Sequence, residues 1–245
     1  MPRAIRFFLP GHVYHLTHRC HDRAWLLKYA SDRKRYRKRL REALKEFKVS
    51  LLNYCITCNH AHLLAVAHDA VGIPALMQAA QSRFAEDYNR RHKRCGAFWS
   101  DRYRCTMIES GTHLWNCTTY IDLNMVRAGA VSHPRDWRWC GYDELTGRRS
   151  RYCLLDKACV AEYLGGGSLD GLKDAYDAAI AQALERGRLE REPQWTEPVI
   201  VGGRQFAESM AIRVKRGVRV EMAQGPDGIW TVREERDTYG KWVRV

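Results

Sequence analysis

The sequence predicts an α+β fold, because short apolar segments typical of strands alternate with longer segments of helical spacing. Apolar segments near residues 12–19, 49–56, 61–67 and 103–108 have the length and composition of strands. Helical spacing of apolar residues is found at about 31–48, 73–93 and 111–127. The resulting order is βαββαβ followed by one extra helix, which is the order of a ferredoxin-like sandwich with an addition at its C-terminal end.

The first two helices are expected to bury one apolar face each. Ser31-Asp32 is interpreted as the cap of the first helix, and Pro74 suits the first turn of the second. The remaining faces of the first helix are strongly basic, which indicates either a solvated face or a surface that contacts phosphate groups. We favour phosphate contact, because few acidic residues lie nearby. The cations are Arg33, Lys34, Arg35, Arg37, Lys38, Arg39 and Arg41.

The composition of the chain changes after the extra helix, where residues 133–152 are rich in aromatic residues, turn residues and arginine. A mostly helical stretch is expected at 154–190, interrupted by Gly165–Gly167, and a hairpin with a turn at 225–228 is expected near the end. We therefore expect a domain at residues 1–150 and a C-terminal extension at 151–245, which binds DNA or has a structural role.

Composition and charge narrow the function classes. The chain has 245 residues and a net charge of +13, and nucleic acid is the commonest partner of such a protein. An anionic membrane surface is the alternative, but no lipidation motif supports it. No segment approaches the length of a membrane span, and the N-terminal residues do not resemble a secretory signal, so we expect a cytoplasmic protein. The nine cysteines are expected to be reduced and mostly buried.

Residues 53–66, NYCITCNHAHLLAV, contain a possible metal site. On a strand, His60 and His62 project from the same face with Cα atoms roughly 6.5–7 Å apart, so both imidazoles can approach one cation. Two histidines at this spacing are more often an exposed or satisfied pair than a metal site, so a metal site needs a third ligand. Cys55 and Cys58 lie nearby, but a zinc knuckle needs a turn between its cysteines and redox use needs a helix start, so neither is favoured.

Two residues of the extra helix can complete a site of this kind. Tyr120 and Asn124 are four residues apart and so share a helix face. A lone tyrosine on a helix is usually a packing residue. Beside a metal, however, its hydroxyl is a good nucleophile toward a phosphodiester, and the Asn124 amide offers an oxygen ligand. Mixed nitrogen and oxygen ligation is compatible with Mg²⁺ or Mn²⁺.

At these residues the sequence resembles the single-tyrosine HUH transposases, and specifically the REP-associated tyrosine transposases, over residues 10 to about 147. The resemblance rests on several segments in family order, and the site residues are retained. The sequence departs from the family pattern at Thr57-Cys58, Met125 and Cys140-Gly141, and none of these positions is a site residue. The matching segments are PGHVYHLTHR, YCITCNHAHLL, FWSDRYRCTMIES, YIDLNMVRAG and WRWCGYDELTG.

The resemblance implies metal-dependent cleavage and rejoining of single-stranded DNA at palindromic hairpins. Tyr120 would form a 5′-phosphotyrosine, and His60, His62 and Asn124 would hold Mg²⁺ or Mn²⁺ against the scissile phosphate. Both monomers and homodimers are compatible with the resemblance. The alternatives are a non-catalytic hairpin-binding module and a hydrolytic nuclease.

The expected DNA contacts lie on the first helix and near the site. Unpaired bases can stack on Phe98, Trp99 or Tyr103, although core packing explains these aromatics equally well. The cations expected to contact the DNA backbone are Arg33, Lys34, Arg37, Lys38, Arg41, Arg102 and Arg127.

Overall fold

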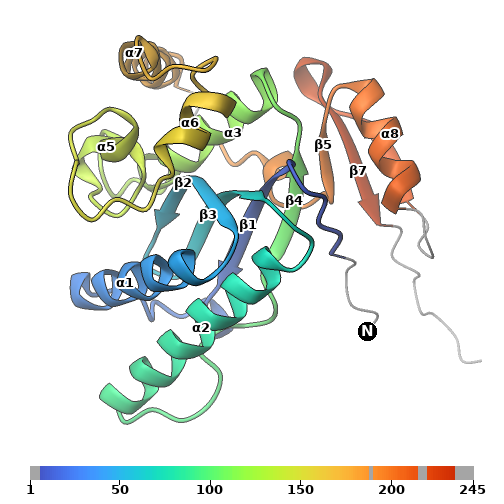
Figure 1. The fold of residues 1–245 in the computed structure, drawn as a ribbon. Helices are drawn as coiled ribbons and strands as arrows, with labels where there is room; N and C mark the ends of the chain where they lie inside the picture. Colours follow the sequence, from blue (N-terminus) through green and yellow to red (C-terminus); the bar gives the residue numbers. More distant parts are fainter. Residues whose placement is uncertain (1–5, 188–189, 215–219, 235–245) are drawn as a thin grey trace, which may run out of the picture.

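The computed structural model describes residues 6–187, 190–214 and 220–234, whose strands form a seven-stranded sheet. The strands lie in the order β2-β3-β1-β4-β5-β7-β6, so the first four make one half and the last three extend the sheet beyond β4 (Figure 1). Their bounds are β1 Val13–Arg19, β2 Val49–Ile56, β3 His60–Ala67, β4 Arg104–Ile108, β5 Ile200–Gly202, β6 Val220–Gln224 and β7 Trp230–Glu234.

The first four strands confirm the predicted ferredoxin-like arrangement. β1 pairs antiparallel with both β3 and β4, and β2 pairs antiparallel with β3. Each of these strands begins and ends within one residue of its prediction. All residues of β2 and all but the first of β3 are buried, because helices cover both faces of the sheet at this point.

Helices α1 (Ala30–Glu46) and α2 (Gly72–Arg91) lie side by side on one face of the sheet (Figure 1). Between them, the ring of Tyr36 lies 5.1 Å from that of Phe84. The predicted cap of the first helix is wrong, because α1 begins at Ala30 without a side-chain cap. Asp32 is buried instead and accepts a 2.9 Å hydrogen bond from Arg91 of α2, so a contact between helices takes the place of the local one.

The predicted extra helix is present as two segments, α3 (Thr112–Asp122) and α4 (Asn124–Arg127), which meet at Leu123. The backbone of Leu123 (φ −74°, ψ 0°) departs from helical geometry at the junction. α3 packs on β2, on the sheet face opposite α1 and α2 (Figure 1).

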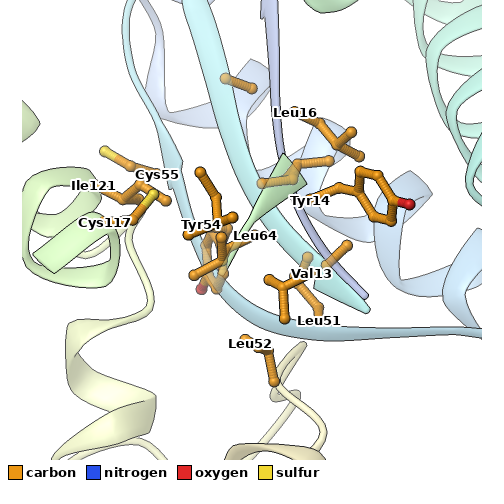
Figure 2. Close-up of a cluster of buried hydrophobic side chains, with 14 of the residues drawn as sticks. Val13, Tyr14, Leu16, Leu51, Leu52, Tyr54, Cys55, Leu64, Cys117 and Ile121 are labelled. Carbon is orange, nitrogen blue, oxygen red and sulfur yellow. The ribbon is translucent and has the colours of Figure 1, made fainter. Parts of the chain in front are cut away.

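Apolar side chains from the strands and α3 form the core on this second face. Figure 2 shows Cys117 and Ile121 of α3 beside Cys55 of β2, and all three residues are fully buried. Ile121 therefore faces the core. Burying a side chain of this size stabilises the fold by about 1.5–3 kcal/mol, so α3 is held firmly against the sheet.

The segment after residue 150 contains further helices and the last three strands of the sheet. The expected helical stretch contains α6 (Lys157–Tyr163) and α7 (Leu172–Glu185), separated by a connection that includes the three glycines, while α5 (Tyr142–Leu145) precedes it. Residues 188 and 189, at its predicted end, lie outside the described residues. Within the described part of the chain, no helix is both long and apolar enough to cross a membrane.

The predicted hairpin is confirmed by the antiparallel pairing of β6 with β7 across Pro226–Gly228. β5 and α8 (Arg204–Val214) were not predicted, since a three-residue strand is too short to show a period. β5 pairs parallel with β4 and antiparallel with β7, and thereby joins the hairpin to the first half of the sheet. Residues 215–219 and 235–245 of this region lie outside the described residues.

Candidate active site

Three histidines meet on the sheet face that α3 covers. His60 and His62 project from β3, with ring centroids 4.8 Å apart, as the spacing predicts. His15 of the neighbouring strand β1 stacks on His62 with ring centroids 5.0 Å apart. His15 and His62 are 1% and 2% exposed, whereas His60, at the first position of β3, is half-buried.

The Nδ1 atoms of His60 and His62 are both occupied by protein groups. Nδ1 of His60 lies 2.7 Å from Oδ1 of Asn59 and 2.9 Å from Oγ1 of Thr57. Nδ1 of His62 lies 2.8 Å from Nε2 of His15. The Nε2 atoms are therefore the nitrogens that the two rings can offer to a ligand.

Tyr120 and Asn124 both reach these histidines, although the helix that was expected to carry them is broken between them. The Tyr120 ring lies 6.2 Å from the ring of His62, and Nδ2 of Asn124 lies 3.1 Å from Nε2 of His62. Tyr120 is 5% exposed and Asn124 is half-buried. The four residues predicted to form a site thus converge at one end of β3.

Arg127 of α4 contacts Tyr120 of α3. Its guanidinium lies 3.9 Å from the centroid of the Tyr120 ring and donates a 2.6 Å hydrogen bond to the Tyr120 backbone carbonyl. Burial raises the pKa of the Tyr120 hydroxyl, and the charge of Arg127 opposes that rise. The phenol is consequently protonated at neutral pH, so it must lose a proton to act as a nucleophile.

Burial keeps the histidines neutral. It lowers the pKa of His60 to about 3 and that of His62 well below the ordinary value, and neighbouring cations act in the same direction. A neutral imidazole has a lone pair for a cation, whereas a protonated one does not. Among the described residues, no group of three or more histidine, cysteine or acidic side chains is placed to hold a metal, so the available donors are two imidazole nitrogens and the Asn124 amide oxygen.

The cysteine pair does not contribute to this site. Cys55 is buried between β2 and α3, where burial raises the pKa of its thiol, and Cys58 lies beside the Arg33 guanidinium at 3.9 Å. The nine cysteines are all free thiols.

Some of the cations predicted to contact DNA are exposed, whereas others are buried or bonded to groups within the fold. Arg33 does not lie on an exposed face: it is 7% exposed and donates to the Leu27 and Lys28 carbonyls, which corrects the prediction. Arg37 is half-buried and donates to Tyr54, Glu144 and the Tyr152 carbonyl, so it too is engaged within the fold. Arg41 is half-buried against Tyr152, while Lys34, Lys38 and Arg102 are exposed.

The aromatic residues considered for base stacking pack inside the protein. Phe98 and Tyr103 are 2% and 6% exposed, and Trp99 stacks on His18 with centroids 4.2 Å apart. They belong to the core under α1 and α2, so the structure favours the packing interpretation.

Two exposed arginines near the site were missed in the sequence. Arg19 is opposite His60 in the β1–β3 register, and Arg104 of β4 is opposite Thr17 of β1. Burial and nearby guanidinium groups, including that of Arg104, lower the pKa of Arg19, while Tyr120 opposes this. Alternation along β1 places His15, Thr17 and Arg19 on one face, which is a signal that could have identified Arg19.

Part of the chain matches a known protein family. Residues 9–124 match the family described as "Transposase IS200 like". This match supports the resemblance seen in the sequence motifs at the level of the IS200-like transposases. A search of curated proteins found no match.

Two solved structures are similar to this chain at low identity. One is a REP-associated tyrosine transposase bound to a REP hairpin, with 15% identity, 60% of this chain and 87% of that chain covered, and a TM-score of 0.49. The other is a putative transposase from Deinococcus radiodurans R1, with 16% identity, 53% and 98% covered, and a TM-score of 0.36. The likeness to this family rests on the match over residues 9–124 and not on these two solved structures.

Proposed function

We propose that this protein cleaves and rejoins single-stranded DNA through a covalent bond to Tyr120, with a divalent cation held by His60, His62 and Asn124. The observation that carries the proposal is the convergence of the Tyr120 ring, the His60 and His62 rings and the Asn124 amide. The match to IS200-like transposases covers all four residues. A binding module would not need this combination of groups.

The donor set fits a divalent cation. Nε2 of His60 has no hydrogen-bond partner among the described residues, and Nε2 of His62 has only the Asn124 amide. Imidazole nitrogen suits Mn²⁺ better than Mg²⁺, although both accept oxygen ligands. When bound, the cation would polarise the scissile phosphate.

The reaction at Tyr120 is a phosphoryl transfer in which bonds are exchanged. The Tyr120 hydroxyl loses its proton to solvent and its oxygen forms a bond to phosphorus. The bond from phosphorus to the 3′ oxygen breaks, and that oxygen takes a proton from solvent and leaves as a 3′-hydroxyl. The product is a 5′-phosphotyrosine, and attack by a 3′-hydroxyl reverses the step and rejoins strands. Arg127 orients the Tyr120 ring, and its charge favours the phenolate.

The proposed substrate is a palindromic DNA hairpin with single-stranded flanks, as the resemblance to the REP-associated tyrosine transposases implies. Such a substrate would be met in the cytoplasm. Arg19 interacts electrostatically with Tyr120 and with Arg104, so both arginines are suited to phosphates close to the cut. Lys34, Lys38 and Arg102 are exposed and are suited to phosphates further along the strand.

The test is a denaturing gel of the protein incubated with end-labelled hairpin DNA from its own genomic neighbourhood, with Mn²⁺, Mg²⁺ or EDTA. We expect a protein-sized adduct that carries the label 3′ of the cut and disappears in EDTA. Tyr120→Phe should reduce the adduct by about 10³-fold or more, since only the nucleophile is removed. Tyr152→Phe, at an exposed position, is the matched control.

Two outcomes would contradict the proposal. Cleavage that persists in Tyr120→Phe would indicate a hydrolytic nuclease. Tight hairpin binding without cleavage, for several hairpins and both metals, would indicate a non-catalytic binding module.

A further inference from the structure

His15 is a third histidine in the site, and its contacts distinguish it from the two proposed ligands. Its Nδ1 lies 2.7 Å from the backbone oxygen of Trp195, and its Nε2 lies 2.8 Å from Nδ1 of His62. Both ring nitrogens therefore already have protein partners. Since the ring is 1% exposed, solvent does not compete for them.

The chemistry of these partners determines where the protons lie. A backbone carbonyl can only accept, so Nδ1 of His15 carries a proton. In a neutral imidazole the other nitrogen is then an acceptor, which means that Nδ1 of His62 must donate to Nε2 of His15. His62 consequently has its lone pair on Nε2, where Nδ2 of Asn124 is placed to donate at 3.1 Å.

We propose that the Trp195 carbonyl and His15 form a hydrogen-bond relay that holds His62 in its Nδ1-protonated tautomer and directs Nε2 toward the cation. The relay rests on the proposed function, because it serves the same site. His15 is a positioning residue, since it acts through His62. Trp195 lies outside residues 9–124, so the C-terminal segment supplies part of the active site.

The Trp195 carbonyl is held rigidly enough for this role. Trp195 is 1% exposed, and its indole Nε1 donates a 2.9 Å hydrogen bond to Glu192. The segment that follows is bonded to β4: Thr106 donates to the Pro198 carbonyl at 2.7 Å and the Met107 amide to the Val199 carbonyl at 2.8 Å. β4 is the neighbour of β1, so the carbonyl and His15 are fixed to adjacent strands.

His60 provides an internal reference for an experiment. Its Nδ1 donates to Oδ1 of Asn59, because the Asn59 amide nitrogen is used in a 3.1 Å bond to the Arg23 carbonyl. His60 is therefore expected in the same tautomer as His62, but through a partner that does not involve His15. A change at His15 should alter the His62 ring and leave the His60 ring unchanged.

The test is ¹⁵N NMR of the histidine rings in the metal-free full-length protein, which distinguishes protonated from lone-pair nitrogens. We expect His62 to be protonated at Nδ1 in the wild type and to lose that preference in His15→Leu. In His15→Gln the side-chain oxygen can accept from His62 Nδ1, so the tautomer should be retained. His12→Gln, at a position outside the site, is the control.

Mn²⁺ affinity, measured from the EPR signal of free Mn²⁺, gives the second readout. His15→Leu should bind about 10- to 100-fold more weakly, and His15→Gln should recover much of the loss. His62 protonated at Nε2 in the wild type would overturn the relay, and this arm does not depend on any variant folding. Equal losses of Mn²⁺ affinity in His15→Leu and His15→Gln would identify His15 as a direct ligand, and this result would also overturn the relay. The predicted tautomer without Mn²⁺ binding would support the relay and contradict the proposed function.

Discussion

Neighbouring residues of α1 have different roles because the helix turns them toward different surroundings. Arg33 is buried and donates to two carbonyls, whereas the adjacent Lys34 is exposed. Arg37 reaches the buried carboxylate of Glu144, whereas Lys38 is exposed beside Glu42. Successive helical residues point about 100° apart, so a run of cations cannot all meet one partner. Charge in the sequence alone does not identify phosphate contacts.

A buried histidine away from the site makes stability depend on pH. His18 is 4% exposed, and burial lowers its pKa to about 4. Between about 6.5 and 4 the unfolded chain binds more protons than the folded one, so the free energy of unfolding falls as the pH falls through this range. The loss from His18 should approach roughly 3 kcal/mol, measured by urea denaturation at pH 7 and pH 4.

The comparison variant is His18→Gln, which cannot titrate and should show a shallower pH dependence than wild type. His21→Gln, at a partly exposed position, should keep the wild-type profile. Equal pH dependence for His18→Gln and wild type would show that His18 is not the origin of the effect.

At the scale of elements, Glu144 of the short helix α5 links several parts of the fold through hydrogen bonds. Glu144 of α5 accepts hydrogen bonds from the Tyr54 hydroxyl of β2 at 2.7 Å and from Arg37 of α1 at 2.8 Å. The same carboxylate accepts from the Leu154 and Leu155 amides at 2.7 and 3.0 Å. One side chain therefore connects a strand, two helices and a loop.

Removal of the Glu144 carboxylate should lower the stability of the fold. In Glu144→Ala, Arg37 and two backbone amides lose their buried partner, so the free energy of unfolding should fall by about 3–5 kcal/mol. Urea denaturation at neutral pH measures the change. Glu162→Ala, on the exposed side of α6, should change stability by less than about 0.5 kcal/mol. A loss below about 1 kcal/mol in Glu144→Ala would show that the network contributes little.

At the scale of the whole molecule, one sheet carries residues from both ends of the chain. His15 lies near the N-terminus and Trp195 follows α7, yet β4 and β5 bring them into hydrogen-bond contact. The net charge of +13 is distributed over a surface where some cations are exposed and others are used inside the fold. Affinity for DNA should therefore depend on the exposed subset.

The salt dependence of hairpin binding tests whether the exposed cations of α1 contact DNA phosphates. Each phosphate contact with duplex DNA contributes about 0.9 to the slope of log affinity against log salt. The double variant Lys34→Gln with Lys38→Gln should reduce the slope by up to about 1.8, measured by fluorescence anisotropy. The matched pair Lys157→Gln with Lys173→Gln, exposed on α6 and α7, should leave the slope unchanged. Equal slopes for both double variants would show that α1 does not follow the DNA backbone.

Much of the fold and the choice of candidate site residues followed from local patterns along the chain. Apolar periodicity predicted β1 to β4, α1 and α2, because it depends on neighbours along the chain. The two-residue spacing of His60 and His62 and the four-residue spacing of Tyr120 and Asn124 likewise predicted which side chains share a face.

Only the tertiary structure decided the remaining features. The burial of Arg33 and the ion pair of Asp32 depend on contacts between elements. β5 is too short to have a pattern, and the bond from His15 to Trp195 joins residues 180 positions apart. Such contacts arise when the sheet assembles, because backbone and side-chain groups far apart in the chain must then satisfy one another away from water.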